Sequence, residues 1–369
     1  MGRLHWIAGR SAAATRATAQ AALAAATQHP ERLDLWMLAG RALGESSDPA
    51  TRGHWQEVVA LFPEAMAAHL AYADCLAGAG EYEAALAVLR GFPVCRETPE
   101  GAVLELRMLM RLKLDQEAAA IAAVAERLAP ADPAIVQYRA LSLLGEPEAL
   151  LAACHRVLAA RPGHANALFF RGQALDRLGR AEEARETIGG QFVSVGSLDF
   201  PEDFHARLRA EILANNTLRP DPRGKSTRGG RQTERLVRPG NVATPALCDA
   251  IREAVEDYAA ALTGEHPFVR GRPGSARLAI WAVVYGDAGT QESHRHPAAW
   301  LSGVFYVGGG GESGALLIGE QGGGQEPVRR VAPLPGRLAM FPSATMHSTE
   351  AAEPGAARIS VAFDVIDAG

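Results

Sequence analysis

Hydrophobic residues recur with two different periods along the chain, and the period changes near residue 190. Between residues 20 and 190, alanine and leucine recur at i, i+3 and i+4, which is the pattern of amphipathic helices. After about residue 240, short apolar runs are separated by turns that contain Gly and Pro, which is typical of an antiparallel sandwich or jelly-roll barrel. We therefore predict an α+β chain of two domains, helical at 1–190 and β-rich at 191–369, with the core of the second at about 240–369.

The helical half contains an internal repeat. The stretch "AYADCLAGAGEYEAALAVL" at 71–89 has a counterpart in "FRGQALDRLGRAEEARETI" at 170–188. In each, a helix of small residues ends near a glycine. A second helix then begins with the pattern acidic-x-x-Ala. Turns of this kind fall at positions 44, 80, 113, 145 and 179, which are 36, 33, 32 and 34 residues apart. That period is expected of a solenoid of helix pairs. A generic alanine-rich helical bundle is the alternative.

The segment between the halves is basic. Residues 219–239, "RPDPRGKSTRGGRQTERLVRP", carry seven basic side chains, and we expect a loop that is either solvated or laid along the mouth of a site. "GKST" is no phosphate loop, because position 219 is Arg where that motif needs Gly. "GGGESG" at 309–314 joins two predicted strands and opens no helix. A helix follows at 244–262, with Thr244 as its predicted N-cap.

Three histidines in the β-rich half suggest a metal site. In "QESHRHPAAWLSGVFYV" (291–307), His294 and His296 are two residues apart, so on an extended strand both side chains lie on one face. His347 follows the strand "GRLAMFP" and comes 53 residues after His294. Two ligands from one strand and a third from a distant strand suit a metal ion that keeps open coordination positions.

A buried cation is predicted next to these histidines. Arg358 and Ser360 in "ARISVAFDV" share one face of an otherwise apolar strand. A guanidinium that points into a barrel needs an anionic partner, and a carboxylate can accept two parallel hydrogen bonds from it. A surface arginine on an edge strand is the alternative.

These motifs carry a family resemblance. Residues 190–369 resemble the iron(II)/2-oxoglutarate-dependent oxygenases, which fold as a double-stranded β-helix. The likeness rests on His294-Arg295-His296-Pro297, Leu301 to Val307, Phe341-Pro342-Ser343, His347, and Arg358 to Val365. It is greatest to a bacterial branch that is often fused to tetratricopeptide repeats. The helical repeats resemble that repeat family too, although most copies lack its tryptophan.

The resemblance implies a set of roles. Fe(II) is held by His294, His296 and His347, and the C5 carboxylate of 2-oxoglutarate is bound by Arg358 and Ser360. The keto acid of 2-oxoglutarate takes two further positions on the metal and O2 takes the last. Tyr285 and Tyr306, predicted on neighbouring strands, line the pocket or bond the 2-oxoglutarate, or else pack in the core.

The ligand set departs from the usual pattern of the superfamily. Most members have His-x-Asp or His-x-Glu, whereas His296 stands here at the carboxylate position. Two other arrangements stay open. In the first, Glu292 supplies the carboxylate ligand. In the second, His296 is the first ligand of the pattern, and Ala298 stands at the carboxylate position, which then has no protein ligand.

Composition limits the partners. The net charge is −5, with a pI of about 6.1, so bulk charge does not favour nucleic acid or a membrane surface. No apolar run reaches the ~20 residues of a membrane helix. Four widely spaced cysteines suggest a reducing compartment, and we expect a cytoplasmic protein of undetermined oligomeric state.

Three functions compete for this pattern. The first is a hydroxylase that acts on a peptide or protein held by the repeats. The second is a catalytically inactive repeat scaffold with a metal-binding barrel. The third is a cupin-type metalloenzyme that does not use 2-oxoglutarate.

Overall fold

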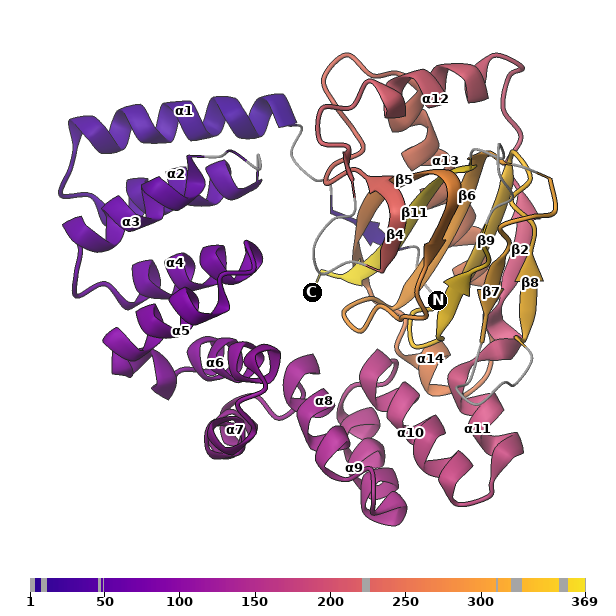
Figure 1. Cartoon of the computed structure of the whole chain (residues 1–369), viewed down its shortest axis with the longest axis horizontal. Coiled ribbons are helices and arrows are strands. Elements are labelled where there is room, and N and C mark those ends of the chain that lie inside the picture. The colour runs from indigo at the N-terminus through magenta and orange to yellow at the C-terminus, as the bar shows by residue number, and fades with distance from the viewer. Residues whose placement is uncertain are drawn as a thin grey trace. The chain divides into compact units, whose positions relative to one another are not determined.

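The computed structural model describes residues 4–7, 12–45, 48, 50–220, 226–309, 311–319, 327–351 and 358–368. Contacts divide the chain into two compact units (Figure 1). Residues 10–139 form the first, here called the solenoid unit, and residues 1–9 together with 140–369 form the second, called the barrel unit. Helices predominate in the first, and the second combines helices with two sheets.

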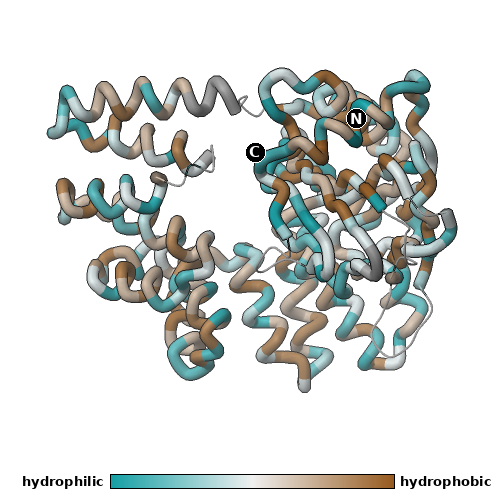
Figure 2. The backbone as a smooth tube through the Cα atoms, turned by 45° about the horizontal axis from the view of Figure 1, so that its top comes forward, coloured by the Kyte–Doolittle hydropathy of each residue, from teal (hydrophilic) through white to brown (hydrophobic). Residues whose placement is uncertain are grey.

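The solenoid unit is built from successive helices that pack as neighbours in chain order. They are α1 (Ala12–Gln28), α2 (Leu33–Glu45), α3 (Thr51–Leu61), α4 (Met66–Gly78), α5 (Tyr82–Gly91), the 3-10 helix η1 (Pro93–Glu97), α6 (Pro99–Leu112) and α7 (Asp115–Leu128). Helix α8 (Pro133–Ser142) contains the division between the units. Hydrophobic and hydrophilic positions alternate along these helices (Figure 2). Their apolar residues meet in small clusters, such as the one around Trp36, Trp55 and Val58.

Four of the five predicted turns, at 80, 113, 145 and 179, are confirmed, and position 44 lies within a helix. Gly80 and Gly179 lie between helices with φ of 80° and 74°, and Lys113 takes the same left-handed conformation at 58°. Gly145 lies between α8 and α9, and Gly44 lies in the last turn of α2. Glycine tolerates positive φ without steric cost, which accounts for its presence at positions 80 and 179. The tetratricopeptide-like solenoid predicted from the sequence is therefore the observed architecture.

The barrel unit begins with helices and ends with strands. Its helices are α9 (Pro147–Ala160), α10 (Ala165–Arg177), α11 (Ala181–Ile188), the 3-10 helix η2 (Gly190–Phe192), α12 (Phe204–Leu213), α13 (Ala243–Ala261) and α14 (Pro267–Arg270). Its strands are β1 (His5–Trp6), β2 (Ser194–Ser197), β3 (Arg219–Pro220), β4 (Thr227–Gln232), β5 (Ser275–Gln291), β6 (Leu301–Gly308), β7 (Leu316–Ile318), β8 (Arg329–Val331), β9 (Arg337–Pro342), β10 (His347–Thr349) and β11 (Arg358–Asp367).

Two sheets form the jelly roll. The larger has the order β2-β9-β6-β11-β5-β4-β3, with β1 paired to β5, and the smaller has the order β10-β7-β8. Neighbouring strands are antiparallel, apart from the parallel pair β1 and β5. Side chains from both sheets, among them Tyr306, Leu316 and Phe341, meet in one apolar cluster. The β-rich fold predicted for this half is confirmed.

Two local predictions are wrong. Segment 219–239 was expected to be a loop, but β4 pairs with β5 along the edge of the larger sheet, because backbone pairing needs no hydrophobic pattern; residues 221–225 lie outside the described part. Thr244 is not the N-cap of α13, since the helix already begins at Ala243. The carboxylate of Glu211 instead accepts hydrogen bonds from the backbone N–H groups of residues 242, 243 and 244 at 2.7 to 2.8 Å.

The change from helix to strand lies near residue 190, as the hydrophobic pattern indicates. The division between compact units, however, falls at 139/140, so helices α9 to α11 belong with the barrel. Among the described helices, none is long and apolar enough to cross a membrane. The four cysteines are all unpaired thiols.

Candidate metal and co-substrate site

Three histidines meet at one end of the jelly roll. His294 and His347 form an isolated antiparallel bridge, with N···O distances of 3.0 and 2.9 Å. The backbone N–H of His296 donates to the Ser343 carbonyl at 3.1 Å. Strand β5 ends at Gln291, so the prediction that a regular strand carries His294 and His296 is wrong. Their extended backbone is held instead by the segment that follows β9.

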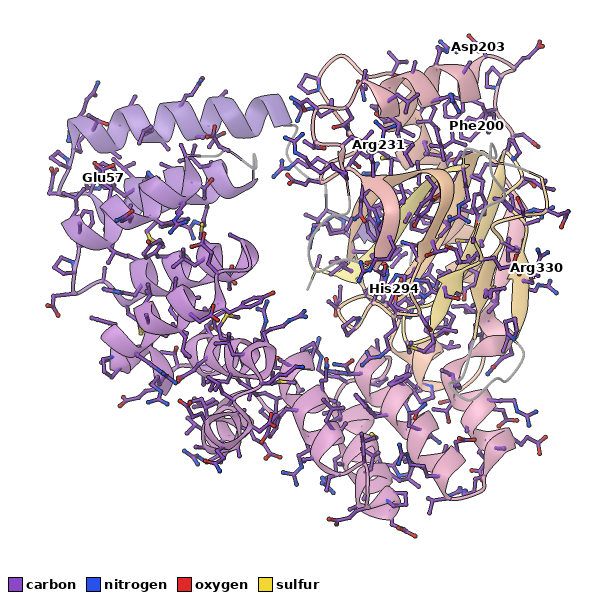
Figure 3. The ribbon with its side chains drawn as sticks, in the orientation of Figure 1. Glu57, Phe200, Asp203, Arg231, His294 and Arg330 are labelled. Atoms are coloured by element: carbon purple, nitrogen blue, oxygen red, sulfur yellow. The ribbon has the colours of Figure 1, made fainter. Side chains whose placement is uncertain are left out.

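The three imidazoles face one another closely enough to share an ion. Their ring centroids are 4.2 Å apart for His294 and His347, and 5.1 Å apart for each of the other two pairs. One nitrogen atom of each ring lies within 4.8 Å of the others. Figure 3 marks His294 beside the barrel strands. Imidazole nitrogens arranged in this way suit Fe, Zn, Cu or Ni.

Burial keeps the rings of His294 and His347 in the form that binds metals. Burial, and secondarily the neighbouring His296, lowers the pKa of His294 to about 4. Burial and both partner imidazoles also hold the pKa of His347 well below its usual value. A metal ligand must be a neutral imidazole, so at neutral pH no proton has to be displaced from either ring.

Each imidazole is oriented through its Nδ1 atom. Nδ1 of His294 lies 2.7 Å from the Glu292 carbonyl oxygen, and Nδ1 of His347 lies 3.1 Å from that of Thr345. Nδ1 of His296 lies 2.6 Å from Oδ1 of Asp364. Such partners fix the tautomer of a metal-binding histidine and leave its other nitrogen for the ion. In this arrangement the Nε2 atoms are the candidate ligands.

Asp364 is a site residue that the sequence interpretation missed. Its Oδ1 also accepts a hydrogen bond from the Ser302 hydroxyl at 2.7 Å, and Ser302 lies 2.8 Å from the hydroxyl of Ser343. The signal was present in the sequence, because Asp364 alternates with Arg358 and Ser360 along β11 and so shares their face.

The carboxylate of Glu292, one alternative metal ligand, is engaged elsewhere. It forms an exposed ion pair with Arg228, with N···O distances of 2.6 and 3.0 Å. Ala298, the position of the other alternative, lines the adjacent cavity. The geometry thus favours the three-histidine set over both alternatives.

Arg358 is almost completely buried, at 1% exposure. Its guanidinium donates to the Gly314 carbonyl and, at 3.1 Å, to the Thr349 hydroxyl. It also lies over the ring of Tyr285, 4.4 Å from the centroid. These contacts take two of the five N–H donors of an arginine. A surface position for Arg358, the alternative from the sequence, is excluded.

Tyr285 provides a second polar group beside Arg358, which it faces across β5 and β11. The Tyr285 hydroxyl is buried and has no hydrogen-bond partner among the described residues. Burial raises the pKa of this phenol, although nearby Arg358 opposes the shift. Two glycines make room for the ring, because a Cβ atom on Gly230 or Gly289 would lie 2.7 or 2.3 Å from it. An orphaned donor beside a buried cation suits an anionic ligand.

Ser360 and Tyr306 face each other across β11 and β6. Ser360 is 7% exposed and lies on the same strand face as Arg358, as predicted. Tyr306 is buried in the apolar cluster between the sheets, and burial raises its pKa. Strands β5 and β6 flank β11 from opposite sides, so the prediction that Tyr285 and Tyr306 lie on neighbouring strands is wrong.

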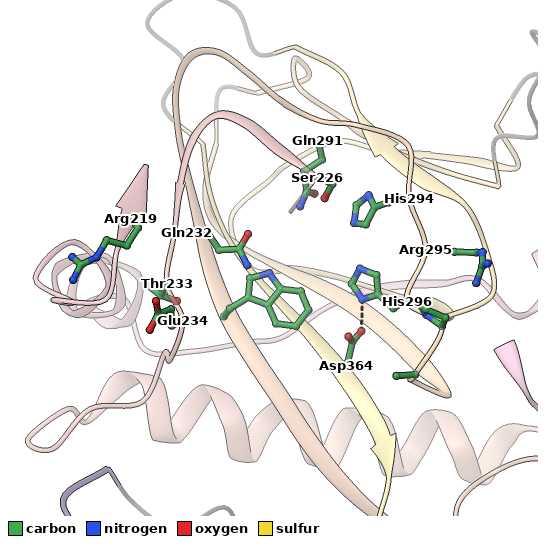
Figure 4. A pocket seen from close by; sticks show the side chains of 13 residues that line it. Arg219, Ser226, Gln232, Thr233, Glu234, Gln291, His294, Arg295, His296 and Asp364 are labelled. Carbon is green, nitrogen blue, oxygen red and sulfur yellow. Dashed lines mark hydrogen bonds and ion pairs between the residues drawn. The ribbon is translucent and has the colours of Figure 1, made fainter. Parts of the chain in front are cut away.

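A cavity of about 580 Å³ opens beside the histidines (Figure 4). It is lined by Arg219, Ser226, Gln232, Thr233, Glu234, Trp281, Gln291, His294, Arg295, His296, Pro297, Ala298 and Asp364. The first five belong to segment 219–239, so the described part of that segment does lie along the mouth of a site. The imidazoles of His294 and His296 face the cavity, while Arg295 extends to the opposite side of their backbone.

Comparison with known proteins agrees with this site. Residues 279–364, which include all three histidines, match the family model described as a putative 2OG-Fe(II) oxygenase. Among curated proteins, none matches the chain in sequence.

Solved structures are similar to parts of the chain. A Pseudomonas putida prolyl-4-hydroxylase is 20% identical, covering 49% of this chain and 94% of that chain, with a TM-score of 0.36. A prolyl hydroxylase from Trichoplax adhaerens, solved with a peptide fragment of hypoxia inducible factor, is 11% identical, covering 52% and 92% with a TM-score of 0.36. YrrB, described as a tetratricopeptide repeat protein with an unusual peptide-binding site, is 17% identical, covering 46% and 90% with a TM-score of 0.38.

Proposed function

Residues 279–364 are an iron(II)/2-oxoglutarate oxygenase domain, and from this premise we propose that the chain hydroxylates a peptide or protein side chain presented by its helical repeats. Dependence on Fe(II), 2-oxoglutarate and O2 follows from the family. The identity of the target and the roles of individual residues are parts of the proposal.

The observation that carries the proposal is the open cluster of three histidines, whose candidate ligand atoms lie within 4.8 Å of one another. His294 and His296 line the cavity, so a bound ion keeps positions that face it. A structural metal site is normally closed by four protein ligands. An open three-ligand site therefore supports catalysis over the inactive-scaffold alternative.

The surroundings of Arg358 fit the far carboxylate of 2-oxoglutarate. Arg358 donates to Thr349, which stands two residues after His347 on strand β10. Two residues of a strand span about 7 Å, so an anion at Arg358 lies within reach of a ligand held at the histidines. The unpartnered Tyr285 hydroxyl adds a donor there. A cupin-type enzyme without 2-oxoglutarate has no need of this anion site.

The protein's own part in the reaction is to hold and orient. When bound, Fe(II) with 2-oxoglutarate supplies the oxidising chemistry that inserts one oxygen atom of O2 into a C–H bond. The three histidines hold the ion, and Asp364 fixes the orientation of His296. Arg358 and Tyr285 anchor the co-substrate, and the cavity walls bring the target bond into place.

A peptide is the substrate class that the rest of the chain suits best. Stacked helix pairs such as those of the solenoid unit present extended concave surfaces. The cavity beside the histidines also offers polar side chains, among them Gln232, Gln291 and Glu234, which can bond to a peptide backbone.

The test has two steps. Purified full-length protein with Fe(II), O2 and 2-oxoglutarate should form succinate, and His347→Ala should form none. Cell proteins or peptide libraries treated with the enzyme should then gain the mass of one oxygen atom on specific peptides. Metal binding without succinate formation would favour the scaffold or the cupin-type enzyme. Succinate formation with products confined to free small molecules would reject the peptide part alone.

A further inference from the structure

The helices next to the barrel contact the segments that carry the histidines. Arg295 stands between His294 and His296 in the chain, and its guanidinium donates to the side-chain oxygen of Asn166 in the first turn of α10. The same guanidinium lies over two rings of α10, 4.4 Å from the centroid of Phe169 and 5.4 Å from that of Phe170. One helix therefore holds the residue between two candidate ligands.

The segment that supplies His347 is fixed to the neighbouring helix. The hydroxyl of Thr345 donates to the carbonyl of Ile188, the last residue of α11, at 3.0 Å. The next residue, Gly189, is so close to Pro342 that an added Cβ atom would lie 2.9 Å from its ring. The turn between β9 and β10 thus packs against the C-terminal end of α11.

A third contact lies at the turn before α10. An added Cβ atom on Gly271 would lie 2.1 Å from the Pro162 carbonyl oxygen and 2.4 Å from Cα of Gly163. Two backbones approach this closely only where neither carries a side chain. The helical hairpin and the barrel therefore meet at a close backbone contact in addition to the side-chain contacts.

We propose that α10 and α11 are a positioning element of the metal site, which acts through Arg295 on His294 and His296 and through Thr345 on His347. This inference rests on the proposed role of the histidines as metal ligands. His294 and His296 lie beyond the end of β5, so strand pairing alone does not set the orientation of their backbone. The contacts from α10 add a side-chain constraint to the backbone hydrogen bonds with His347 and Ser343.

The proposal changes where the catalytic domain begins. The hydrophobic pattern of the sequence assigns α10 and α11 to the solenoid as its last repeat. By contact, they belong to the unit that contains the barrel. Arg295 is thus a positioning residue, since its guanidinium points away from the imidazoles (Figure 4) and acts through their backbone.

The test uses full-length protein and Co(II), whose visible spectrum reports the geometry of its ligands. The variants are Arg295→Met, Arg295→Lys, Asn166→Ala and the double variant Arg295→Met/Asn166→Ala. The matched control is Arg177→Met, because Arg177 is also on α10 but donates to the Leu144 carbonyl, within the repeats. The melting temperature of each metal-free protein is measured in parallel.

We expect Arg295→Met to weaken Co(II) binding about tenfold, as removal of groups that orient ligands commonly does, and to change the visible spectrum. Asn166→Ala should give a smaller effect in the same direction, and the double variant should be no worse than Arg295→Met alone, because the two residues act as one unit. Arg295→Lys should recover part of the loss, and Arg177→Met should match wild type.

Wild-type Co(II) affinity and spectrum in both Arg295→Met and Asn166→Ala would overturn the inference while leaving the proposed function intact. If Arg295→Met does not fold, Asn166→Ala decides, since it keeps Arg295 and the fold of α10. Failure of the wild-type protein to bind Co(II) or Fe(II) would overturn both this inference and the ligand assignment beneath it.

Discussion

Oδ1 of Asp364 lies 2.6 Å from Nδ1 of His296, and the Ser302 hydroxyl donates to the same oxygen. His296 occupies the position where most of the superfamily has a carboxylate ligand. In the proposed three-histidine site the negative charge is therefore still present, but one side chain further from the metal. A carboxylate that accepts from a histidine raises the basicity of its ring, so we expect Asp364 to compensate in part for the missing anionic ligand if His296 binds the metal as proposed.

Replacing Asp364 tests that compensation. Asp364→Asn keeps the shape of the side chain and removes its charge, so we expect Fe(II) affinity to fall about tenfold. Isothermal titration of metal into the protein under anaerobic conditions measures the change. Ser302→Ala, which removes a neutral donor and leaves the charge, should have a much smaller effect. Equal losses in the two variants would argue that packing, and not charge, is what matters.

The ligand set itself is open to a direct test. His294→Ala and His347→Ala should abolish metal binding and succinate formation, because each removes one of three protein ligands. Glu292→Ala should bind metal as wild type does, since its carboxylate pairs with Arg228. His69→Gln, on helix α4 of the solenoid unit, is the control for loss of an unrelated histidine. Loss of metal binding in Glu292→Ala would restore the carboxylate alternative.

Arg358 and Tyr285 should act on 2-oxoglutarate and not on the metal. Arg358→Ala leaves a carboxylate unpaired in a buried site, and we expect 2-oxoglutarate affinity to fall about a hundredfold or more, at about 1.4 kcal/mol per decade. Tyr285→Phe and Ser360→Ala should each cost about tenfold, as one neutral hydrogen bond is lost. Arg358→Lys should recover only part, because a point charge replaces a two-pronged donor.

The readouts for these variants are the KM for 2-oxoglutarate and the affinity for Fe(II) measured without it. Metal affinity should stay near the wild-type value in all four. A normal KM in Arg358→Ala would mean that the anion binds elsewhere, and the basic residues of segment 219–239 would then be examined first.

Acid should destabilise the metal-free protein through its histidines. Burial lowers the pKa of His294 from 6.5 to about 4, so between these pH values the unfolded chain binds a proton that the folded protein does not. The free energy of unfolding should therefore fall as the pH falls below 6.5, by up to about 1.4 kcal/mol per pH unit for one such histidine. Above pH 6.5 this contribution is constant.

Urea unfolding of the metal-free protein at several pH values between about 5 and 7 measures this slope. His294→Asn should flatten it, because the titrating ring is gone, whereas His29→Asn, at an exposed position on the helical side, should leave it unchanged. An identical slope in His294→Asn and wild type would show that His294 does not titrate between the folded and unfolded states.

The close contact of Gly271 with Pro162 and Gly163 predicts that a side chain at position 271 destabilises the fold. Gly271→Ala should destabilise the protein by about 2 kcal/mol, as overpacking of a closed contact does. Gly274→Ala is the matched control, because an added Cβ atom there meets nothing within 4 Å. Thermal unfolding of the two variants measures the difference. Equal melting temperatures would mean that the two backbones can separate at little cost.

The sequence was informative wherever a feature repeats or alternates. The turns at 80, 113, 145 and 179 could be found because each helix pair repeats the same local rule. Arg358 and Ser360 could be placed on one face because a strand alternates with a period of two. His294, His296 and His347 stood out because packing gains nothing from clustered imidazoles.

Features that depend on contacts across long separations could not be predicted. Arg295 contacts Asn166, which is 129 residues away in the chain. Glu211 caps a helix that begins more than thirty residues later. No local sequence pattern indicates either pair. The sequence of strand β4 resembles that of a loop, because its pairing with β5 is made by the backbone and needs no hydrophobic pattern. Asp364, the partner of His296, was missed although it shares a strand face with Arg358 and Ser360, because an aspartate near the end of an apolar strand resembles a solvent-facing residue.

The division at 139/140 also bears on how such an enzyme could be given new targets. If α9 to α11 travel with the barrel, the helices before residue 140 can be exchanged, shortened or duplicated without disturbing the groups that hold the ion. A chimera that keeps residues 1–9, whose strand β1 pairs with β5, and replaces residues 10–139 would take its chemistry from one parent and its choice of partner from the other. A junction near 190 would cut between Arg295 and Asn166 and give a barrel without the support of its histidines.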